Sequence, residues 1–136
     1  MTEIIVDNGV SEPGLTELDL TRFSQLKRLE IGDHCFSYVD ELKLIGMNEL
    51  ESVVIGESSF MKNENSYGNS NRHFSLKNCP KLKSLKIGYD SFSDYSVCEI
   101  ENMDALEVIE MGDLNKESYN FAYGSLELKS IIDRNE

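Results

Sequence analysis

A pattern of eleven residues recurs four times along the chain, and this repetition constrains the fold more than any other feature of the sequence. The four copies read LKRLEIGDHCF, LESVVIGESSF, LKSLKIGYDSF and LEVIEMGDLNK, and they begin at Leu26, Leu50, Leu82 and Leu106. Their starts are 24, 32 and 24 residues apart. Such a period is typical of stacked-repeat architectures, in which each unit is one small element of supersecondary structure.

A second, shorter apolar pattern precedes each copy, and it begins at Leu18, Leu42, Phe74 and Cys98. In both patterns apolar residues occupy every second position, as Leu29 and Ile31 do, which predicts short strands with one buried face. A single unit cannot bury such a face, whereas stacked units with parallel strands can. The repeats therefore predict a mainly β protein built as a right-handed parallel solenoid with two short parallel sheets.

The repetition covers nearly the whole chain, which predicts one domain over residues 1–136 with about five coils of roughly 24 residues. Partial coils are expected at 1–17, where Ile4 and Val6 form the inward pair, and at 122–136. In the last partial coil the apolar positions are Leu126, Leu128 and Ile131. The longer spacing between the second and third copies predicts a loop insertion at 61–73.

Two rows of small or turn-forming residues mark the corners of the expected coils. One row follows the longer strands, where a left-handed backbone would suit glycine, and consists of Gly32, Gly56, Gly88 and Gly112. The other corner carries residue types that also tolerate the left-handed region, namely Gly46, Asn78 and Asn102. A stacked aromatic row is expected from Phe36, Phe60 and Phe92.

The element L-x-x-L-x-I-G-x-x-x-F resembles the leucine-rich repeat, L-x-x-L-x-L-x-x-N/C-x-L, with phenylalanine in the last apolar position. The glycine, the phenylalanine and the second strand most resemble the Treponema/BspA-type repeats of bacteria and protists. The Asn/Cys position departs from the family pattern and holds His34, Ser58, Asp90 and Leu114, so the resemblance implies no asparagine ladder. Helical segments are not evident either, and a β-solenoid outside the leucine-rich-repeat class is the alternative.

Composition excludes several classes of partner. With 25 acidic and 13 basic residues the formal net charge is −12, which repels phosphate backbones and argues against nucleic acid as a ligand. No apolar stretch approaches the roughly 20 residues that span a bilayer. The start of the chain lacks the pattern of a signal peptide, and the three cysteines show no CxxC spacing. These features predict a cytoplasmic protein, with a fragment of a secreted or surface protein as the alternative.

The sequence offers little that would carry catalysis. His34 and His73 lie in different repeats, and no nearby nucleophile or orienting carboxylate is evident for either of them. Cys79 and Cys98 occupy inward positions, and Cys35 precedes the aromatic row with some exposure expected. No phosphate-binding glycine loop and no clustered metal ligands are present. We therefore expect no enzymatic activity, no cofactor and no metal.

Two functional hypotheses remain. The first is a protein-interaction module that presents an extended face to a partner with a basic patch. Its candidate binding residues on the outward side of the longer strands are Arg28, Glu30, Val54, Lys86, Val108 and Glu110, and those of the predicted loop are Met61, Tyr67 and Arg72. The alternative is a structural subunit that associates with itself end to end through the edges of the solenoid and forms filaments.

Overall fold

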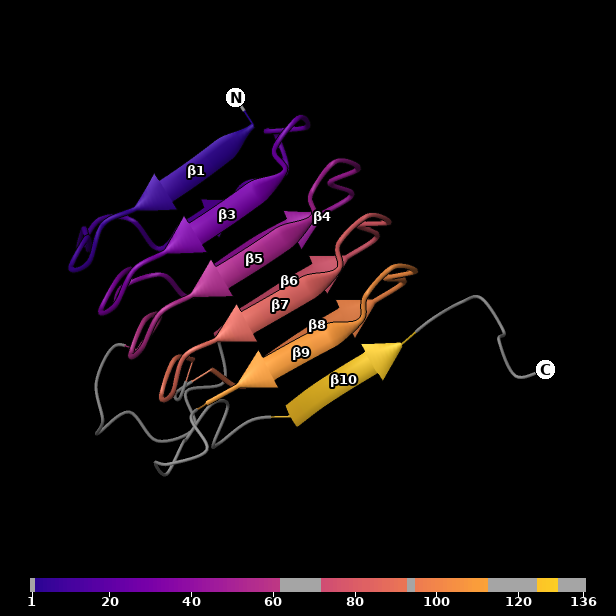
Figure 1. Ribbon diagram of the computed structural model, residues 1–136. Coiled ribbons are helices and arrows are strands. Elements are labelled where there is room, and N and C mark those ends of the chain that lie inside the picture. The colour runs from indigo at the N-terminus through magenta and orange to yellow at the C-terminus, as the bar shows by residue number, and fades with distance from the viewer. Residues whose placement is uncertain (1, 62–71, 93–94, 113–124, 130–136) are drawn as a thin grey trace.

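The chain forms two five-stranded parallel sheets, and its computed structural model describes residues 2–61, 72–92, 95–112 and 125–129. The first sheet has the order β1-β3-β5-β7-β9, with bounds Glu3–Val6, Arg28–Ile31, Ser52–Ile55, Ser84–Ile87 and Val108–Met111. The second sheet has the order β10-β8-β6-β4-β2, with bounds Ser125–Lys129, Val97–Glu101, His73–Lys77, Glu41–Ile45 and Glu17–Asp19. Successive strands alternate between the sheets (Figure 1), so the expected mainly β architecture with two parallel sheets is confirmed.

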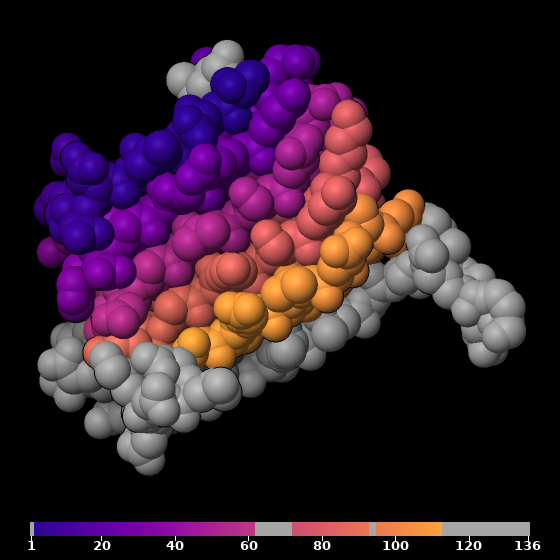
Figure 2. Space-filling view, in the orientation of Figure 1, coloured from indigo at the N-terminus to yellow at the C-terminus, as the bar shows by residue number. Residues whose placement is uncertain are grey.

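The sequence repeat appears in the structure as strict register. Leu29 pairs with Val53, and Val53 pairs with Leu85, so equivalent positions of successive repeats form straight rows. In the space-filling view the successive segments of the chain form parallel bands across the molecule (Figure 2). The inward rows are buried as expected, with 1% of Leu29 and none of Leu42, Leu44 or Leu85 exposed.

The left-handed backbone predicted for the corner at Gly46, Asn78 and Asn102 (the second corner) is confirmed. The left-handed glycines predicted for the corner after the longer strands (the first corner) are wrong in three of four repeats. Gly46, Asn78 and Asn102 all have a positive φ, between 56° and 67°. In the other row, however, only Gly112 has a positive φ, and Gly32, Gly56 and Gly88 do not. The left-handed residues of that corner lie two and four positions after the glycine and are His34, Phe36, Ser58, Phe60, Asp90 and Phe92.

A left-handed phenylalanine is unusual because its Cβ crowds the following carbonyl, at a cost of about 1–2 kcal/mol. Here that conformation directs the aromatic rings into the core. The centroids of Phe36 and Phe60 lie 5.4 Å apart, and those of Phe60 and Phe92 lie 4.7 Å apart. The predicted aromatic row is therefore confirmed, and its burial offsets the backbone strain of the turn.

Glycine is required in the first corner because successive repeats approach closely there. A Cβ at Gly88 would lie 2.6 Å from the carbonyl carbon and oxygen of Gly56. A Cβ at Gly56 would lie 2.7 Å from the carbonyl carbon of Gly32. Because the obstacle is backbone, which cannot move aside like a side chain, the row selects glycine for its lack of a Cβ.

A buried polar row lies beside the glycines and links the repeats. The hydroxyl of Ser91 donates to the carbonyl of Gly56 at 2.6 Å, and that of Ser59 donates to the carbonyl of Gly32 at 2.7 Å. Cys35 occupies the same row and its thiol donates to the carbonyl of Asp7 at 3.1 Å. The expectation that Cys35 is partly exposed is wrong, because its side chain is fully buried in this row.

We expect Ser59→Ala to destabilise the protein by about 1–3 kcal/mol, the usual cost of a buried polar group without a partner. The Ser59 hydroxyl also accepts from the amide of Cys35 at 3.1 Å, so its removal leaves both a donor and an acceptor unpaired. Urea unfolding followed by circular dichroism measures the effect. Ser59→Cys is the matched control, because Cys35 already occupies this row, and an equal loss in both variants would contradict the hydrogen-bonding role.

Candidate functional site

The outward side of the first sheet carries the candidate binding face, which consists of two straight rows of side chains. One row contains Glu3, Arg28, Ser52, Ser84 and Val108. The other contains Ile5, Glu30, Val54, Lys86 and Glu110. The structure thus brings together on one face all six candidate residues that the sequence placed on the longer strands.

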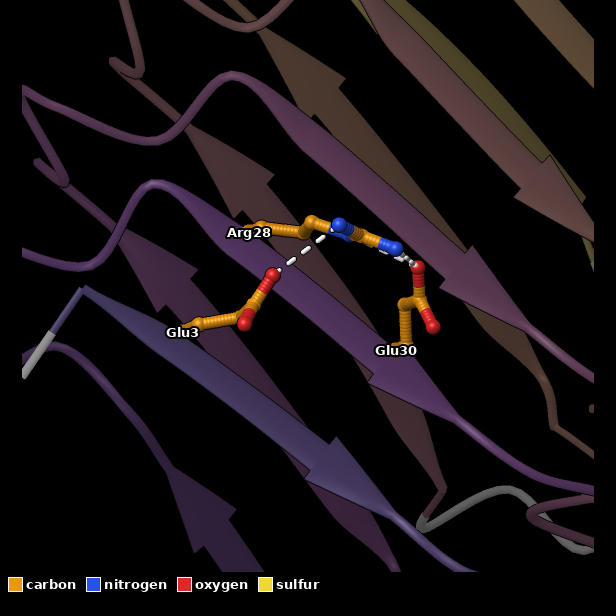
Figure 3. Close-up of polar contacts among 3 residues, drawn as sticks. All are labelled: Glu3, Arg28 and Glu30. Atoms are coloured by element: carbon orange, nitrogen blue, oxygen red, sulfur yellow. Dashed lines mark hydrogen bonds and ion pairs between the residues drawn. The ribbon is translucent and has the colours of Figure 1, made fainter.

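The end of this face at β1 and β3 is an ion-paired cluster (Figure 3). The Nη1 atom of Arg28 lies 2.9 Å from Oε2 of Glu3, and its Nε and Nη2 both donate to Oε2 of Glu30. The hydrogen bond to Glu30, followed by the charge of that carboxylate, raises the pKa of the Arg28 guanidinium. All three side chains are solvent-accessible, so their ion pairs contribute little to the stability of the fold. Their main effect is on the distribution of charge at this end of the face.

The centre and the far end of the face combine apolar surface with unpaired charge. Val54 is partly exposed, and Val108 is 38% exposed. Lys86 lies in register between Val54 and Glu110, and it forms no ion pair with any described residue. An exposed cation beside apolar side chains can contact a partner without first breaking an internal ion pair.

The outward side of the second sheet is different, since Lys43 and Lys77, two of the described side chains there, form ion pairs with carboxylates. The Nζ atom of Lys43 lies 3.2 Å from Glu17 and 3.8 Å from Glu41. That of Lys77 lies 3.3 Å from Glu99 and 3.9 Å from Glu101. The hydrogen bond that Lys43 donates to Glu17, followed by the charges of Glu41 and Glu17, raises the pKa of Lys43. Sequence reasoning missed this ionic face, although the alternation of Glu and Lys along the shorter strands signals it.

The predicted loop patch is partly contradicted. Arg72 is fully buried, so it is not available as a contact residue as predicted. Its guanidinium reaches into the preceding repeat, where Nη2 donates to the carbonyls of Ser37 and Val39. Met61 is partly exposed, Tyr67 lies outside the described residues, and His73 begins β6 instead of ending the loop.

The buried cysteines have the properties of core residues. Burial raises the pKa of the Cys98 thiol to about 12, and burial also raises the pKa of the Cys79 thiol. Both thiols remain protonated at neutral pH, and a protonated thiol is a poor nucleophile and a poor metal ligand. In the described part of the chain no three His, Cys, Asp or Glu side chains gather as metal ligands would, and no helix there has the length and apolarity to cross a membrane.

A shallow, open hollow lies at the corner where the chain enters the longer strands. It is lined by Glu51, Pro80, Lys81, Lys83 and Ala105. Lys81 is bound to Glu49 at 3.0 Å, outside the hollow. The mixture of exposed charges and the lack of enclosure give a small molecule little apolar surface to bury, so the hollow is not the candidate site.

Comparison of the chain with protein-family models, with curated proteins and with solved structures finds no match.

Proposed function

We propose that this protein is a non-catalytic protein-interaction module, a parallel solenoid of leucine-rich-repeat type whose first sheet presents the binding face. One observation carries the proposal. Among the described residues, five large apolar side chains are exposed. Two of them, Ile5 and Val108, lie on the outward side of the first sheet, and a third, Ile109, lies in the inward row of its last strand. None belongs to the described side chains of the second sheet, where charged residues cover the outward side.

The charge of the chain favours a basic partner. The formal net charge of −12 gives a field that accelerates association with a basic protein surface. On the binding face itself the carboxylates of Glu3 and Glu30 flank Arg28 and neutralise it. A partner with arginine or lysine side chains around an apolar centre would complement Glu30, Val54 and Glu110.

We expect Val108→Glu to weaken partner binding at least tenfold while the melting temperature stays unchanged, because the side chain is exposed and has no core contact to lose. Val97→Glu is the matched control, since Val97 is partly exposed on the second sheet. A photo-crosslinking residue placed at position 108 or 97 identifies the partner in an extract of the source cells, and the purified partner is then titrated by calorimetry. Equal losses in both variants would reject the first sheet as the binding face.

The alternative function is a structural subunit that associates end to end. Exposure of Ile109 at the outer edge of β9 favours this alternative, because an inward-row residue is open there to a further strand. Sedimentation velocity over a wide range of protein concentration separates the two proposals. A monomer at all concentrations supports the interaction module, whereas growth into long polymers supports the filament subunit.

A further inference from the structure

The turns of the second corner carry charges that alternate in sign from one repeat to the next. These turns connect β2 with β3, β4 with β5, β6 with β7 and β8 with β9, and they lie side by side along one border of the molecule (Figure 1). Each turn contains charged residues of one sign, which form a charge band. The four bands are Arg22 and Lys27, then Glu49 and Glu51, then Lys81 and Lys83, and then Asp104 and Glu107.

One member of each band belongs to a straight row. The amide of Glu51 donates to the carbonyl of Lys27 at 2.7 Å, and the amide of Lys83 donates to the carbonyl of Glu51 at 2.9 Å. The amide of Glu107 donates to the carbonyl of Lys83, also at 2.9 Å. The row therefore places one charge on each repeat, at the spacing of about 4.8 Å between neighbouring strands. All four side chains are exposed.

The chain itself makes little use of this alternation. Lys81 and Glu49, which belong to neighbouring bands, form an ion pair at 3.0 Å. In contrast, the members of the straight row, Lys27, Glu51, Lys83 and Glu107, form no ion pair with any described residue. Their charges can therefore bind a partner without first breaking an internal ion pair.

The open hollow at this corner lies beside the two central charges of the row. Its volume is about 340 Å³, and Glu51 and Lys83 line it together with Pro80, Lys81 and Ala105. The hollow is too open for a small molecule, but it has room for long side chains that project from a second protein surface. Because both signs of charge line it, lysine and glutamate side chains can each find an opposite charge there.

The order of the bands makes this corner complementary to itself. The signs run plus, minus, plus, minus, so a copy turned about a two-fold axis presents minus, plus, minus, plus. With the axis between the second and third bands, Glu51 meets the partner's Lys83, and Lys27 meets the partner's Glu107. Each contact occurs twice, as two-fold symmetry requires, and every band faces its opposite. A copy in the same direction and register would face like charges in all four bands.

We propose that the second corner binds a second copy of this chain and forms a closed dimer with two-fold symmetry through the charge bands. This surface is separate from the candidate binding face, whose two rows contain neither Glu51 nor Lys83. Exposed ion pairs contribute at most about 1 kcal/mol each, so the dimer is weak and reversible. Because it is closed, its mass stops at twice that of the chain, unlike a filament.

The net charge of −12 opposes the association of two copies, and the ionic strength decides how strongly. At about 0.1 M the Debye length is about 10 Å, so repulsion between distant charges of the two copies is largely screened, whereas pairs in contact are screened less. At about 1 M the Debye length falls to about 3 Å, and the contact pairs weaken as well. The dimer is therefore expected at about 0.1 M salt and should dissociate at about 1 M.

Sedimentation velocity of the full chain over a wide range of protein concentration tests the proposal. Glu51→Lys and Lys83→Glu each place two pairs of like charges beside the two-fold axis, so each should weaken the dimer at least tenfold. The double variant Glu51→Lys with Lys83→Glu restores opposite charges and should dimerise as the wild type does. Glu12→Lys is the matched control, because this exposed residue between β1 and β2 gives the same change of net charge outside the bands, and it should not weaken the dimer.

The double variant also distinguishes the dimer from a staggered assembly. A parallel copy shifted by one repeat matches three of the four bands in the wild type and leads to open polymers. In the double variant the same shift would place Lys27 against a lysine and Glu107 against a glutamate. A monomeric wild type, growth beyond the dimer, or a double variant that does not recover would overturn the proposal. The experiment leaves Val108 unchanged, so its failure would not decide the role of the outward face.

Discussion

Gly88→Ala should destabilise the protein by roughly 3 kcal/mol or more, at the upper end of the cost of overpacking a core. The new methyl group would lie 2.6 Å from the carbonyl atoms of Gly56 and 2.7 Å from the amide nitrogen of Glu57. Relief requires the two repeats to separate. Separation would lengthen the hydrogen bond from the Gly88 amide to the Ile55 carbonyl, now 2.8 Å, and would weaken the packing between neighbouring strands. Urea unfolding monitored by circular dichroism measures the loss.

The matched control for this prediction is Gly46→Asn at the opposite corner. Gly46 has φ +67°, and a Cβ there would meet no atom within 4 Å. Asn78 and Asn102 occupy the same place in later repeats with φ of 56° and 57°, so asparagine suits this backbone. The expected change is within about 0.5 kcal/mol, as for other surface substitutions. If Gly88→Ala proved equally mild, close approach would not be the reason for glycine in the first row.

The comparison of these two glycine positions shows why the sequence predicted the fold better than the detail of its corners. Periodicity places strands and inward residues, because burial requires one face of every strand to be apolar in each repeat. Glycine at a corner has two explanations, a left-handed backbone or a close contact, and composition does not distinguish them. The φ of Gly88, which is not positive, and its close approach to Gly56 decide between them.

The left-handed phenylalanines could not have been predicted from the sequence for a related reason. Intrinsic preferences disfavour a positive φ for a bulky residue, and only the tertiary environment reverses that preference. Phe92 stacks on Phe60 at 4.7 Å and on Phe74 at 5.0 Å, and Phe60 and Phe74 belong to different repeats. The energy of these contacts depends on the stacking of repeats, which no local pattern encodes.

The candidate site was predicted in part. Alternation in the longer strands placed Arg28, Lys86 and Glu110 correctly on one outward face, because side chains of a strand alternate between its two sides. The ion pairs of Arg28 with Glu3 and Glu30 depend on rotamers and on neighbouring strands, so they required the structure. Arg72 was misplaced because composition alone assigned the whole segment after Phe60 to a surface loop.

Arg72→Ala should destabilise the protein by about 3–5 kcal/mol, the combined cost of a large-to-small substitution in the core and of buried carbonyls that lose their donor. None of the Arg72 side chain is exposed. Its Nη2 donates to the carbonyls of Ser37 at 2.9 Å and Val39 at 2.7 Å, and its Cζ lies 4.9 Å from the ring centroid of Tyr95. The substitution removes a cation-π contact and two charge-assisted hydrogen bonds, and it leaves a cavity between repeats. Urea unfolding again provides the measurement.

Three further variants separate the contributions around Arg72. Arg72→Lys should recover little of the loss, because one ammonium group cannot reproduce a planar guanidinium that donates to carbonyls and stacks on a ring. Asp40→Asn should cost less than Arg72→Ala, since the Asp40 carboxylate, 3.0 Å from the Nε of Arg72, is 41% exposed and solvated. Tyr95→Phe should cost about 1 kcal/mol, because it removes the hydrogen bond from its hydroxyl to the Val39 carbonyl and keeps the ring.

The order of these losses tests whether Arg72 joins the repeats from inside the core. Its main-chain carbonyl accepts from the amide of Ser96 at 2.9 Å and from the Ser96 hydroxyl at 3.1 Å, in the repeat that follows. Its side chain binds Ser37 and Val39 in the repeat that precedes, so one residue connects three successive repeats. A cost below about 1 kcal/mol for Arg72→Ala would mean that the side chain behaves as a surface residue, as the sequence had suggested. A large cost fully recovered by Arg72→Lys would assign the effect to charge alone, and a large cost without recovery would assign it to the geometry of the guanidinium.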